Sequence, residues 1–171
     1  MLNPNDIKLN DLSEKDIERL LEIQIECKLS IWSREDYQRE LGRTDSHILV
    51  IRLNNKVIGF VAARLIISEL KFSGKKYSEA EVLNFGVIKE FQDRGIGKIL
   101  FKEFLQEVQL LGVKTIWLEV RAGNSKAIKF YENSGFVEIQ KRKNFYAQPL
   151  EDTILMKLDG IDLSDIDFCK T

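Results

Sequence analysis

Residues 81–97 read EVLNFGVIKEFQDRGIG, and this stretch decides the fold because it joins a strand to a helix through a glycine-containing turn. The branched and aromatic residues before the turn predict a strand over Glu81–Ile88. After Gly97 the apolar residues recur at helical spacing: Ile99, Leu100, Phe104, Leu105, Val108 and Leu111. Backbone N–H groups and the positive end of a helix converge on an anion at such a junction, so the turn is a candidate phosphate site.

Two well-known phosphate motifs are excluded at this turn by single positions. A Walker loop would require Gly at Gln92 and Ser or Thr at Ile99, and the dinucleotide pattern would require Gly at Leu100. A nucleotide-binding module is therefore disfavoured. Gly95 and Gly97 lack Cβ, which lets a ligand approach the backbone closely. The alternative interpretation is a turn that uses glycine for chain direction alone.

Outward from this junction the pattern predicts further elements on both sides. They are a strand at Ile7–Leu9, helices over 13–28 and 33–41, a hairpin of His47–Leu53 with Lys56–Arg64, a polar loop over Lys71–Glu79, a strand at Thr115–Val120, a helix at Asn124–Ser134, and strands at Phe136–Lys141 and Thr153–Leu158. The apolar residues assigned to the first helix are Ile17, Leu20, Leu21 and Ile25. Two consecutive strand-then-helix units imply a sheet that is at least partly parallel or mixed.

The composition is that of an ordinary globular domain. Of 171 residues, 44% are hydrophobic and 31% are charged, and 26 Lys and Arg balance 27 Asp and Glu. The resulting net charge of -1 gives no global argument for nucleic acid or an anionic membrane, so neither is expected as a partner. The first residues lack the basic and apolar regions of a signal peptide, so a cytoplasmic location is expected.

Neither the cysteines nor the single histidine predicts a metal site. Cys27 and Cys169 lie far apart in the sequence and are expected to be free thiols. His47 is distant from every motif and is expected to be structural, so we expect no metal. The acidic segment Asp159–Thr171 is either a frayed tail or a short docking segment, and the frayed tail is favoured.

The junction and the stretch that follows it resemble the GNAT superfamily of N-acetyltransferases. The run Gln92–Gly97 is similar to that superfamily's pyrophosphate loop. The stretches Trp117–Ile128 and Phe130–Phe136, with LEVRAGN and FYENSGF, resemble the RimI-type family, which acetylates the N-terminal alanine of a small-subunit ribosomal protein. The resemblance covers about Ile7 to Leu158, although the Lys71–Glu79 loop is longer than is typical.

This resemblance implies a fold and a co-substrate. The fold is α/β, with a mixed, mostly antiparallel central sheet of about seven strands flanked by about four helices. Residues 1–158 would form the acetyltransferase domain and 159–171 an acidic C-terminal tail. The co-substrate would be acetyl-CoA, with no metal. The sequence does not indicate an oligomeric state, and independently of the resemblance we expect a monomer or weak dimer. The implied cofactor-binding residues are Phe85, Gly86, Val87, Gln92, Asp93, Arg94, Gly95, Ile96, Gly97, Lys98, Asn124 and Tyr131.

Two side chains are the candidate catalytic residues. Glu119 lies near the end of an otherwise apolar strand, where partial burial would raise its pKa, and the resemblance implies that it is the general base. Its alternative interpretation is an exposed carboxylate or a partner for Arg121. Tyr131 is protonated at neutral pH and by resemblance donates a proton to the departing thiolate of CoA. It could also simply pack its helix, as Asn124 could simply cap that helix.

The acceptor is the least constrained part of the interpretation. The resemblance assigns substrate contacts to Ile31, Trp32, Ser33, Asn144, Phe145 and Tyr146, and Glu35 could meet basic acceptor side chains. An acceptor other than a protein N-terminus, such as a polyamine, an aminoglycoside or a lysine side chain, would need no change of fold. A non-catalytic sensor of acyl-CoA is a further alternative, which the presence of both Glu119 and Tyr131 disfavours.

Overall fold

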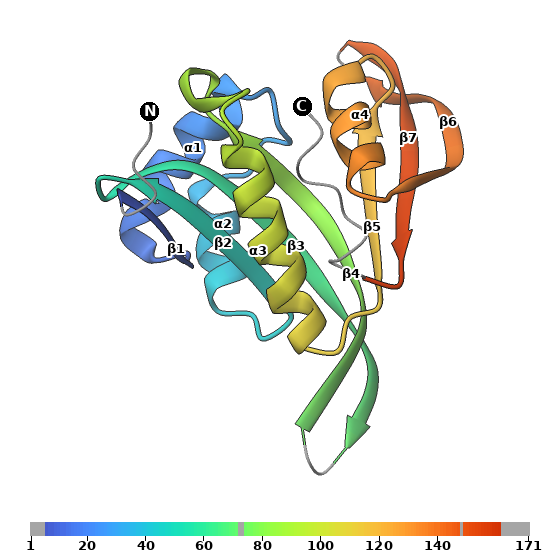
Figure 1. Ribbon diagram of the computed structural model, residues 1–171, viewed down its shortest axis with the longest axis horizontal. Helices are drawn as coiled ribbons and strands as arrows, with labels where there is room; N and C mark the ends of the chain where they lie inside the picture. The colour runs from blue at the N-terminus through green and yellow to red at the C-terminus, as the bar shows by residue number, and fades with distance from the viewer. Residues whose placement is uncertain (1–5, 72–73, 148, 162–171) are drawn as a thin grey trace. The chain divides into compact units, whose positions relative to one another are not determined.

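A computed structural model describes residues 6–71, 74–147 and 149–161. Its strands form a seven-stranded sheet in the order β1-β2-β3-β4-β5-β7-β6. The pairing of β4 with β5 is parallel, whereas β1 with β2, β2 with β3, β5 with β7 and β6 with β7 are antiparallel. This arrangement confirms the predicted mixed, mostly antiparallel sheet with helices around it (Figure 1).

The chain divides into two compact units. The first contains residues up to Leu65 together with 83–107, and the second contains 66–82 and the residues from Val108 onward. The first unit contains β1 (Ile7–Asp11), η2 (Glu14–Asp16), α1 (Ile17–Glu26), α2 (Arg34–Leu41), β2 (Ser46–Leu53), η3 (Lys89–Phe91), and parts of β3 (Lys56–Lys71), β4 (Gly74–Val87) and α3 (Ile96–Leu110). The second contains the rest of β3, β4 and α3, and β5 (Thr115–Arg121), α4 (Ser125–Asn133), β6 (Val137–Ala147) and β7 (Leu150–Asp159).

In the first unit the sheet is covered on both faces (Figure 1). The ring of Phe85 on β4 lies 5.2 Å from the ring of Phe101 on α3, whereas a Cβ placed on the neighbouring Gly86 would meet Cys27 and Leu29 after α1. Successive strand residues point to opposite faces, so α3 covers one face and the region of α1 the other. The predicted hairpin is confirmed, with a two-residue turn at Asn54 and Asn55, both at positive φ.

The buried face of α1 differs from the predicted one. Ile25 was expected in the core but its side chain is 67% exposed, whereas Ile23 and the polar Gln24 are buried. The stripe runs through Ile17, Leu20 and Gln24 at helical spacing, and the polar character of Gln24 concealed its place in that stripe. In α3 the expected core residues Leu100, Phe104, Leu105 and Val108 are fully buried, but Ile99 is 42% exposed, and Leu111, which follows the helix, is 43% exposed.

The predicted polar loop over Lys71–Glu79 is wrong. β3 extends to Lys71 and β4 begins at Gly74, so most of this segment is strand. Glu79 is already paired with Thr115 of β5 in the parallel ladder. A polar, lysine-rich composition conceals a strand because the ladder is held by backbone hydrogen bonds, which any side chain permits.

The acidic tail was expected to begin at Asp159, and its first residues are ordered parts of the second unit. Ile161 is buried, and its carbonyl accepts a hydrogen bond of 2.6 Å from Nε2 of Gln109. The choice between a frayed tail and a docking segment concerns 162–171, which lie outside the described residues.

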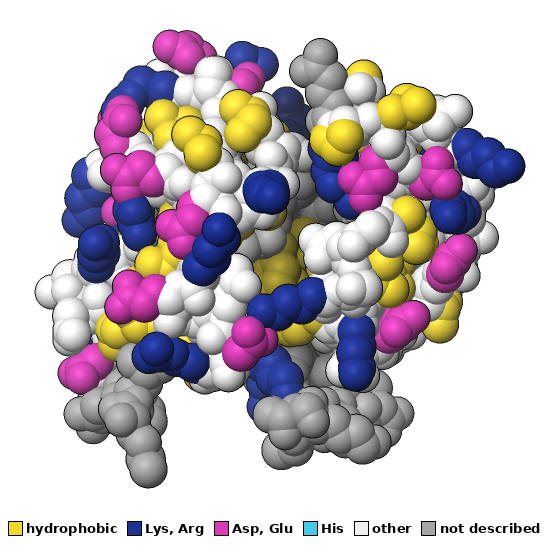
Figure 2. All heavy atoms as spheres, turned by 90° about the horizontal axis from the view of Figure 1, so that it is seen from above, with side chains coloured by type: hydrophobic (Ala, Val, Ile, Leu, Met, Phe, Trp, Pro, Cys, Tyr) yellow, Lys and Arg dark blue, Asp and Glu magenta, His cyan; other side chains and the backbone are white. Residues whose placement is uncertain are grey.

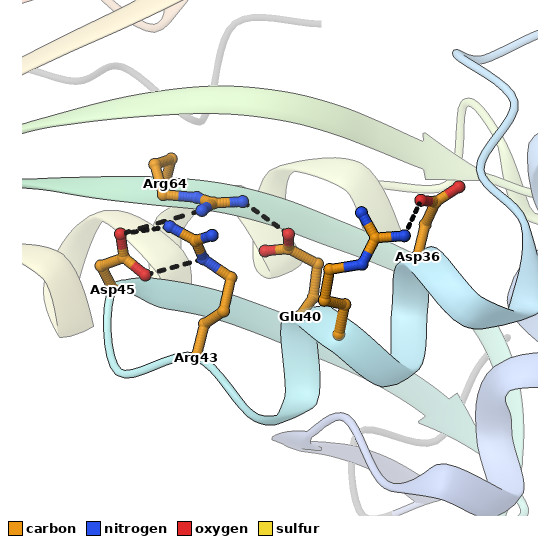
Figure 3. A network of polar contacts seen from close by, with 6 residues as sticks. Asp36, Glu40, Arg43, Asp45 and Arg64 are labelled. Carbon is orange, nitrogen blue, oxygen red and sulfur yellow. Dashed lines mark hydrogen bonds and ion pairs between the residues drawn. The ribbon is translucent and has the colours of Figure 1, made fainter.

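Charged side chains attach the helices of the first unit to its sheet. Arg64 on β3 pairs with Glu40 on α2 at 2.5 Å and with Asp45 at 3.8 Å, and Arg43 bonds both oxygens of Asp45 (Figure 3). Arg52 on β2 donates hydrogen bonds to Asp16 from both of its terminal nitrogens, at 2.9 and 2.6 Å, and both side chains are largely buried. Burial raises the pKa of Asp16, but the hydrogen bonds from Arg52 and Ser13 outweigh it and lower the pKa.

We expect Arg52→Met to lower the free energy of unfolding by about 3 kcal/mol near neutral pH, because it leaves Asp16 as an unpaired buried charge. In the unchanged protein the lowered pKa means that the stabilisation is complete above 3.8 and is lost as the pH falls through the folded value. The loss caused by Arg52→Met should therefore shrink in acid. Urea denaturation near neutral pH and again in acid measures the free energy of unfolding of both proteins. Arg43→Met, which breaks the exposed pair with Asp45, should cost much less, and equal costs would contradict the prediction.

Candidate active site

The turn between β4 and α3 has the backbone of an anion-binding loop. Asp93 and Gly95 both have positive φ, at 58° and 79°, and α3 starts directly after them with the amide of Ile99 bonded to the carbonyl of Gly95. Such a backbone, followed by a helix N-terminus, directs N–H groups toward a negative ligand. A Cβ added at Gly95 would meet no heavy atom within 4 Å, so open space adjoins this part of the loop.

Two side-chain contacts fix the entrance to this loop. Nε2 of Gln92 donates a 2.8 Å hydrogen bond to the carbonyl of Val87, at the end of β4. The guanidinium of Arg94 lies 5.6 Å from the centre of the Phe91 ring, and the Arg94 residue is exposed. The loop therefore presents a cation beside a helix N-terminus, an arrangement suited to phosphate oxygens.

The end of β4 lies in close contact with the α1–α2 connection. A Cβ at Gly86 would lie 2.9 Å from Cδ1 of Leu29 and 3.2 Å from Cβ of Cys27, so a side chain there would displace the connection. Sγ of Cys27 donates to the carbonyl of Val87 at 3.2 Å, and burial raises the pKa of this thiol to about 11. Cys27 is a free thiol, as expected.

The α1–α2 connection presents the candidate acceptor residues of the first unit. Ile31 is 68% exposed, Trp32 is half-buried, and Ser33 caps α2 by accepting a hydrogen bond from the amide of Asp36. Two side chains that the sequence did not suggest, Gln24 and Asn84, bond the backbone of this connection. Both are buried polar residues within apolar stretches, which is the signal that could have identified them.

In the second unit, Glu119 is on the half-exposed face of β5. Ile116, Leu118 and Val120 are buried and alternate with Trp117, Glu119 and Arg121. Oε1 of Glu119 accepts a 2.7 Å hydrogen bond from Arg142 on β6, and its side chain is 25% exposed. Arg121, considered above as a partner for Glu119, instead pairs with Glu151 at 3.0 Å.

Tyr131 is a buried residue of α4. Its ring lies 5.5 Å from that of Phe130 and 5.6 Å from that of Phe136, and 7% of the residue is exposed. Burial raises the pKa of its hydroxyl further above the ordinary value of 10.0, so the group stays protonated throughout the physiological range. The ring packing considered as an alternative is thus present, and it fixes where the hydroxyl points.

The turn between β5 and α4 is held from β7. Glu151 accepts a hydrogen bond of 2.8 Å from the amide of Gly123 and one of 3.0 Å from Arg121, and these hydrogen bonds lower the pKa of Glu151. Asn124 is exposed and caps α4 by accepting from the amide of Ala127 at 3.1 Å, so its structural role is present.

The remaining candidate residues lie in a bulge of β6. Between the pairs Arg142 with Thr153 and Tyr146 with Glu151, three residues of β6 face one residue of β7. Asn144 has φ 54°, and its amide donates to Asp152 at 3.0 Å. Phe145 is 47% exposed, and the Tyr146 ring lies 3.8 Å from the guanidinium carbon of Arg121. The sequence predicted the strand only to Lys141, because a bulge breaks the alternation that identifies strands.

The structure thus gathers the predicted residues into two groups, one in each unit. The first unit holds the loop, the end of β4 and the α1–α2 connection; the second holds Glu119, Asn124, Tyr131 and the β6 bulge.

His47 lies apart from the residues of both groups in the sequence and pairs with Glu107 at 2.8 Å. With Asp11 these two form the one His and acid cluster, among the residues that the structure describes, whose ligand atoms lie within 4.8 Å of one another. Burial raises the pKa of Glu107, and the neighbouring His47 partly offsets this effect.

The surface gives no sign of a dominant charge on the face drawn in Figure 2, where basic and acidic side chains are mixed. Within the described ranges, none of the helices combines the length and apolar character that crossing a membrane requires.

Comparison with known proteins gives consistent findings. The sequence matches the acetyltransferase (GNAT) family over residues 17–136. It is similar to a [ribosomal protein bS18]-alanine N-acetyltransferase of Salmonella typhimurium, with 32% identity over 151 residues that make up 86% of this chain and 93% of the relative. The ribosomal-protein-S18-alanine N-acetyltransferase from Escherichia coli has a TM-score of 0.77 at 27% identity, over 90% of this chain and 93% of that one. Arabidopsis thaliana NAA60 in complex with acetyl-CoA shares the fold, with a TM-score of 0.76 at 23% identity over 90% and 99%.

Proposed function

Because the chain belongs to the acetyltransferase (GNAT) family and is an acetyl-CoA-dependent N-acetyltransferase, we propose that its acceptor is the N-terminal α-amino group of a protein that begins with alanine. The ribosomal protein bS18 is the acceptor that its relatives indicate. The observation that carries this proposal is the similarity of almost the whole chain to bS18-alanine N-acetyltransferases. We expect the protein in the cytoplasm, where such an acceptor is made.

The donor would bind through the first group of residues. The loop Gln92–Lys98 would hold the pyrophosphate of acetyl-CoA with its N–H groups, assisted by Arg94. The backbone of Phe85–Val87 would pair with the pantetheine arm, and its amide would polarise the acetyl carbonyl. In the second unit, Asn124 and Tyr131 complete the residues assigned to the donor.

We expect Gly95→Ala to raise the dissociation constant of acetyl-CoA about tenfold or more, because the methyl group enters the space proposed for the phosphates. Gly160→Ala is the matched control, since Gly160 also has positive φ, at 65°, and equally open surroundings. Both changes cost roughly 1–2 kcal/mol of backbone strain. Calorimetric titration should show a weakened affinity for Gly95→Ala alone. An equal loss in both variants would mean that strain, and not the ligand site, is responsible.

The chemistry would need a base and an acid. Glu119, directly or through water, would take a proton from the α-ammonium group, whose pKa is about 7.7 to 8.0. The neutral nitrogen then attacks the acetyl carbonyl, the C–N bond forms, and the C–S bond breaks. Tyr131 would give its proton to the departing sulfur, and the second proton that the nitrogen loses as the amide forms would return to the tyrosinate. The products are then the acetylated amine and CoA thiol, with the first proton released to solvent from Glu119. Arg142 bonds Oε1 of Glu119, and the other carboxylate oxygen would take the proton.

The resemblance assigns acceptor contacts to the exposed side chain of Ile31 on the α1–α2 connection and, separately, to Asn144–Tyr146 at the β6 bulge. The two segments belong to different units, and each is held firmly by hydrogen bonds from its own unit. Each segment carries an exposed apolar side chain, Ile31 in the first unit and Phe145 in the second, of the kind that binds a peptide side chain.

Acceptor profiling tests the proposal. The panel contains a peptide that copies the bS18 N-terminus, the same peptide with a blocked N-terminus, a polyamine and an aminoglycoside, each at saturating acetyl-CoA. The proposal predicts the highest kcat/KM for the free peptide and none for the blocked one. A higher kcat/KM for a small amine would identify a different acceptor, and CoA binding without transfer to any acceptor would favour the sensor.

A further inference from the structure

Two buried amide side chains, one on α1 and one on β4, hold the α1–α2 connection in place. Asn84 on β4 is 5% exposed; its Oδ1 accepts from the amide of Ser30, and its Nδ2 donates to the carbonyl of the same residue, both at 3.1 Å. Gln24 on α1 is 1% exposed; its Nε2 donates 2.7 Å to the carbonyl of Trp32, and its Oε1 accepts 3.1 Å from the amide of Trp32. Each side chain therefore pairs with both polar groups of one backbone residue.

These side-chain hydrogen bonds take the place of the backbone hydrogen bonds that a helix or strand would provide. Residues 27–33 belong to no helix or strand. The amides of residues 27–29 bond carbonyls of α1, whereas Ser30 and Trp32 are bonded by the two side chains. Ser30 and Trp32 are bonded on either side of Ile31, whose side chain is left 68% exposed. Tyr37 gives the Gln24 side chain a third hydrogen bond, from its hydroxyl to Oε1 at 3.0 Å, and the Tyr37 ring packs 5.2 Å from the ring of Trp32, a contact that Tyr37→Phe keeps.

Burying these two amides costs free energy, and the fold alone does not require polar side chains at these positions. A buried amide must satisfy its donor and acceptor, and an apolar residue at either position would pack without that need. Position 84 lies in an apolar strand beside Gly86, whose missing side chain admits the connection. The amides therefore fix the path of the chain at Ile31.

We propose that Asn84 and Gln24 are positioning residues for the acceptor, which act by holding Ile31 where the first residues of the acceptor peptide bind. This inference rests on the proposed function. It assigns the two amides to acceptor binding and not to acetyl-CoA or to the chemical step. A connection free to move would have to be ordered by each incoming peptide, and that ordering weakens binding.

The variants are Asn84→Leu, which keeps the branching of the side chain, and Gln24→Met, which approximates its length, and both remove the hydrogen bonds. Each should raise KM for the peptide about tenfold while KM for acetyl-CoA and kcat change little. Ile31→Ala, an exposed substitution that leaves both amides in place, should raise the peptide KM in the same way. Tyr37→Phe is the matched control because it removes a buried hydrogen bond to Gln24 and leaves both bonds to Trp32, so peptide KM should stay unchanged.

Hydrogen exchange provides a readout that does not depend on activity. The amides of Ser30 and Trp32 should exchange faster in Asn84→Leu and Gln24→Met respectively, and at the original rate in Ile31→Ala. Faster exchange with an unchanged peptide KM overturns the inference, as do equal losses for both substrates or unchanged exchange. If the unchanged protein acetylates no peptide, the proposed function fails and the acceptor role fails with it, whereas the exchange rates still report whether the amides hold the connection.

Discussion

Glu119→Gln is expected to lower kcat/KM for the peptide acceptor by about 10²- to 10⁴-fold at neutral pH, the range that a general base supplies. The amide is nearly the same size as the carboxylate but cannot accept the proton from the α-ammonium group. Stopped-time assays of thiol release across the pH range measure the effect. The deficit should shrink as the pH rises above the amine pKa of about 7.7 to 8.0, because the acceptor is then already neutral.

Arg142→Gln separates this role from a structural one. It breaks the same 2.7 Å ion pair as Glu119→Gln but keeps the carboxylate, so the protein should retain most of its activity. If both variants lose activity to the same extent, the ion pair and not the base is what the reaction requires. A deficit of Glu119→Gln that is independent of pH would also contradict the assignment.

Tyr131→Phe is expected to reduce kcat by about 10²-fold or more, because the departing thiolate loses its proton donor. The buried ring contacts with Phe130 and Phe136 remain, so the thermal midpoint should change little. Because burial raises the pKa of Tyr131, the unchanged enzyme should show no loss of activity from tyrosine ionisation as the pH rises through 10.0. Rapid-mixing measurements of a single turnover report the chemical step directly.

The control for Tyr131 is Tyr37→Phe, which removes the hydroxyl of another buried tyrosine and should leave kcat unchanged. A Tyr131→Phe variant with full kcat would show that Tyr131 serves packing alone. A falling limb near pH 8 that Tyr131→Phe abolishes would contradict the raised pKa.

Elements whose pattern reflects burial were predicted well from the sequence. β5 alternates strictly between buried and half-buried residues, and α3 buries Leu100, Phe104 and Val108 at helical spacing, so both were identified within a few residues. The helix start at Ser33 was also correct, because its capping box with Asp36 is a purely local signal. The end of β3 at Lys71 and the start of β4 at Gly74 were missed because a polar strand without alternation gives no signal in the composition.

The catalytic candidates came from a resemblance, and their partners came only from the structure. Glu119 and Arg142 are 23 residues apart, Ser30 and Asn84 are 54 apart, and no periodicity links such positions. The sequence alone does not distinguish Arg121 from Arg142 as the partner of Glu119. Gln24 and Asn84 did leave a signal, since each is a polar residue in an otherwise apolar pattern, but that signal does not name the partner.

Mass spectrometry of one reaction tests the acceptor assignment most directly. The purified protein is incubated with acetyl-CoA and a peptide that copies the N-terminus of bS18, carries alanine first and includes an internal lysine. Fragmentation then locates the added acetyl group. We predict a single acetyl group on the α-nitrogen of the alanine, absent when Glu119→Gln replaces the unchanged protein for the same time at neutral pH. Acetylation of the lysine alone, or an unmodified peptide under conditions in which acetyl-CoA binds, would contradict the proposed function.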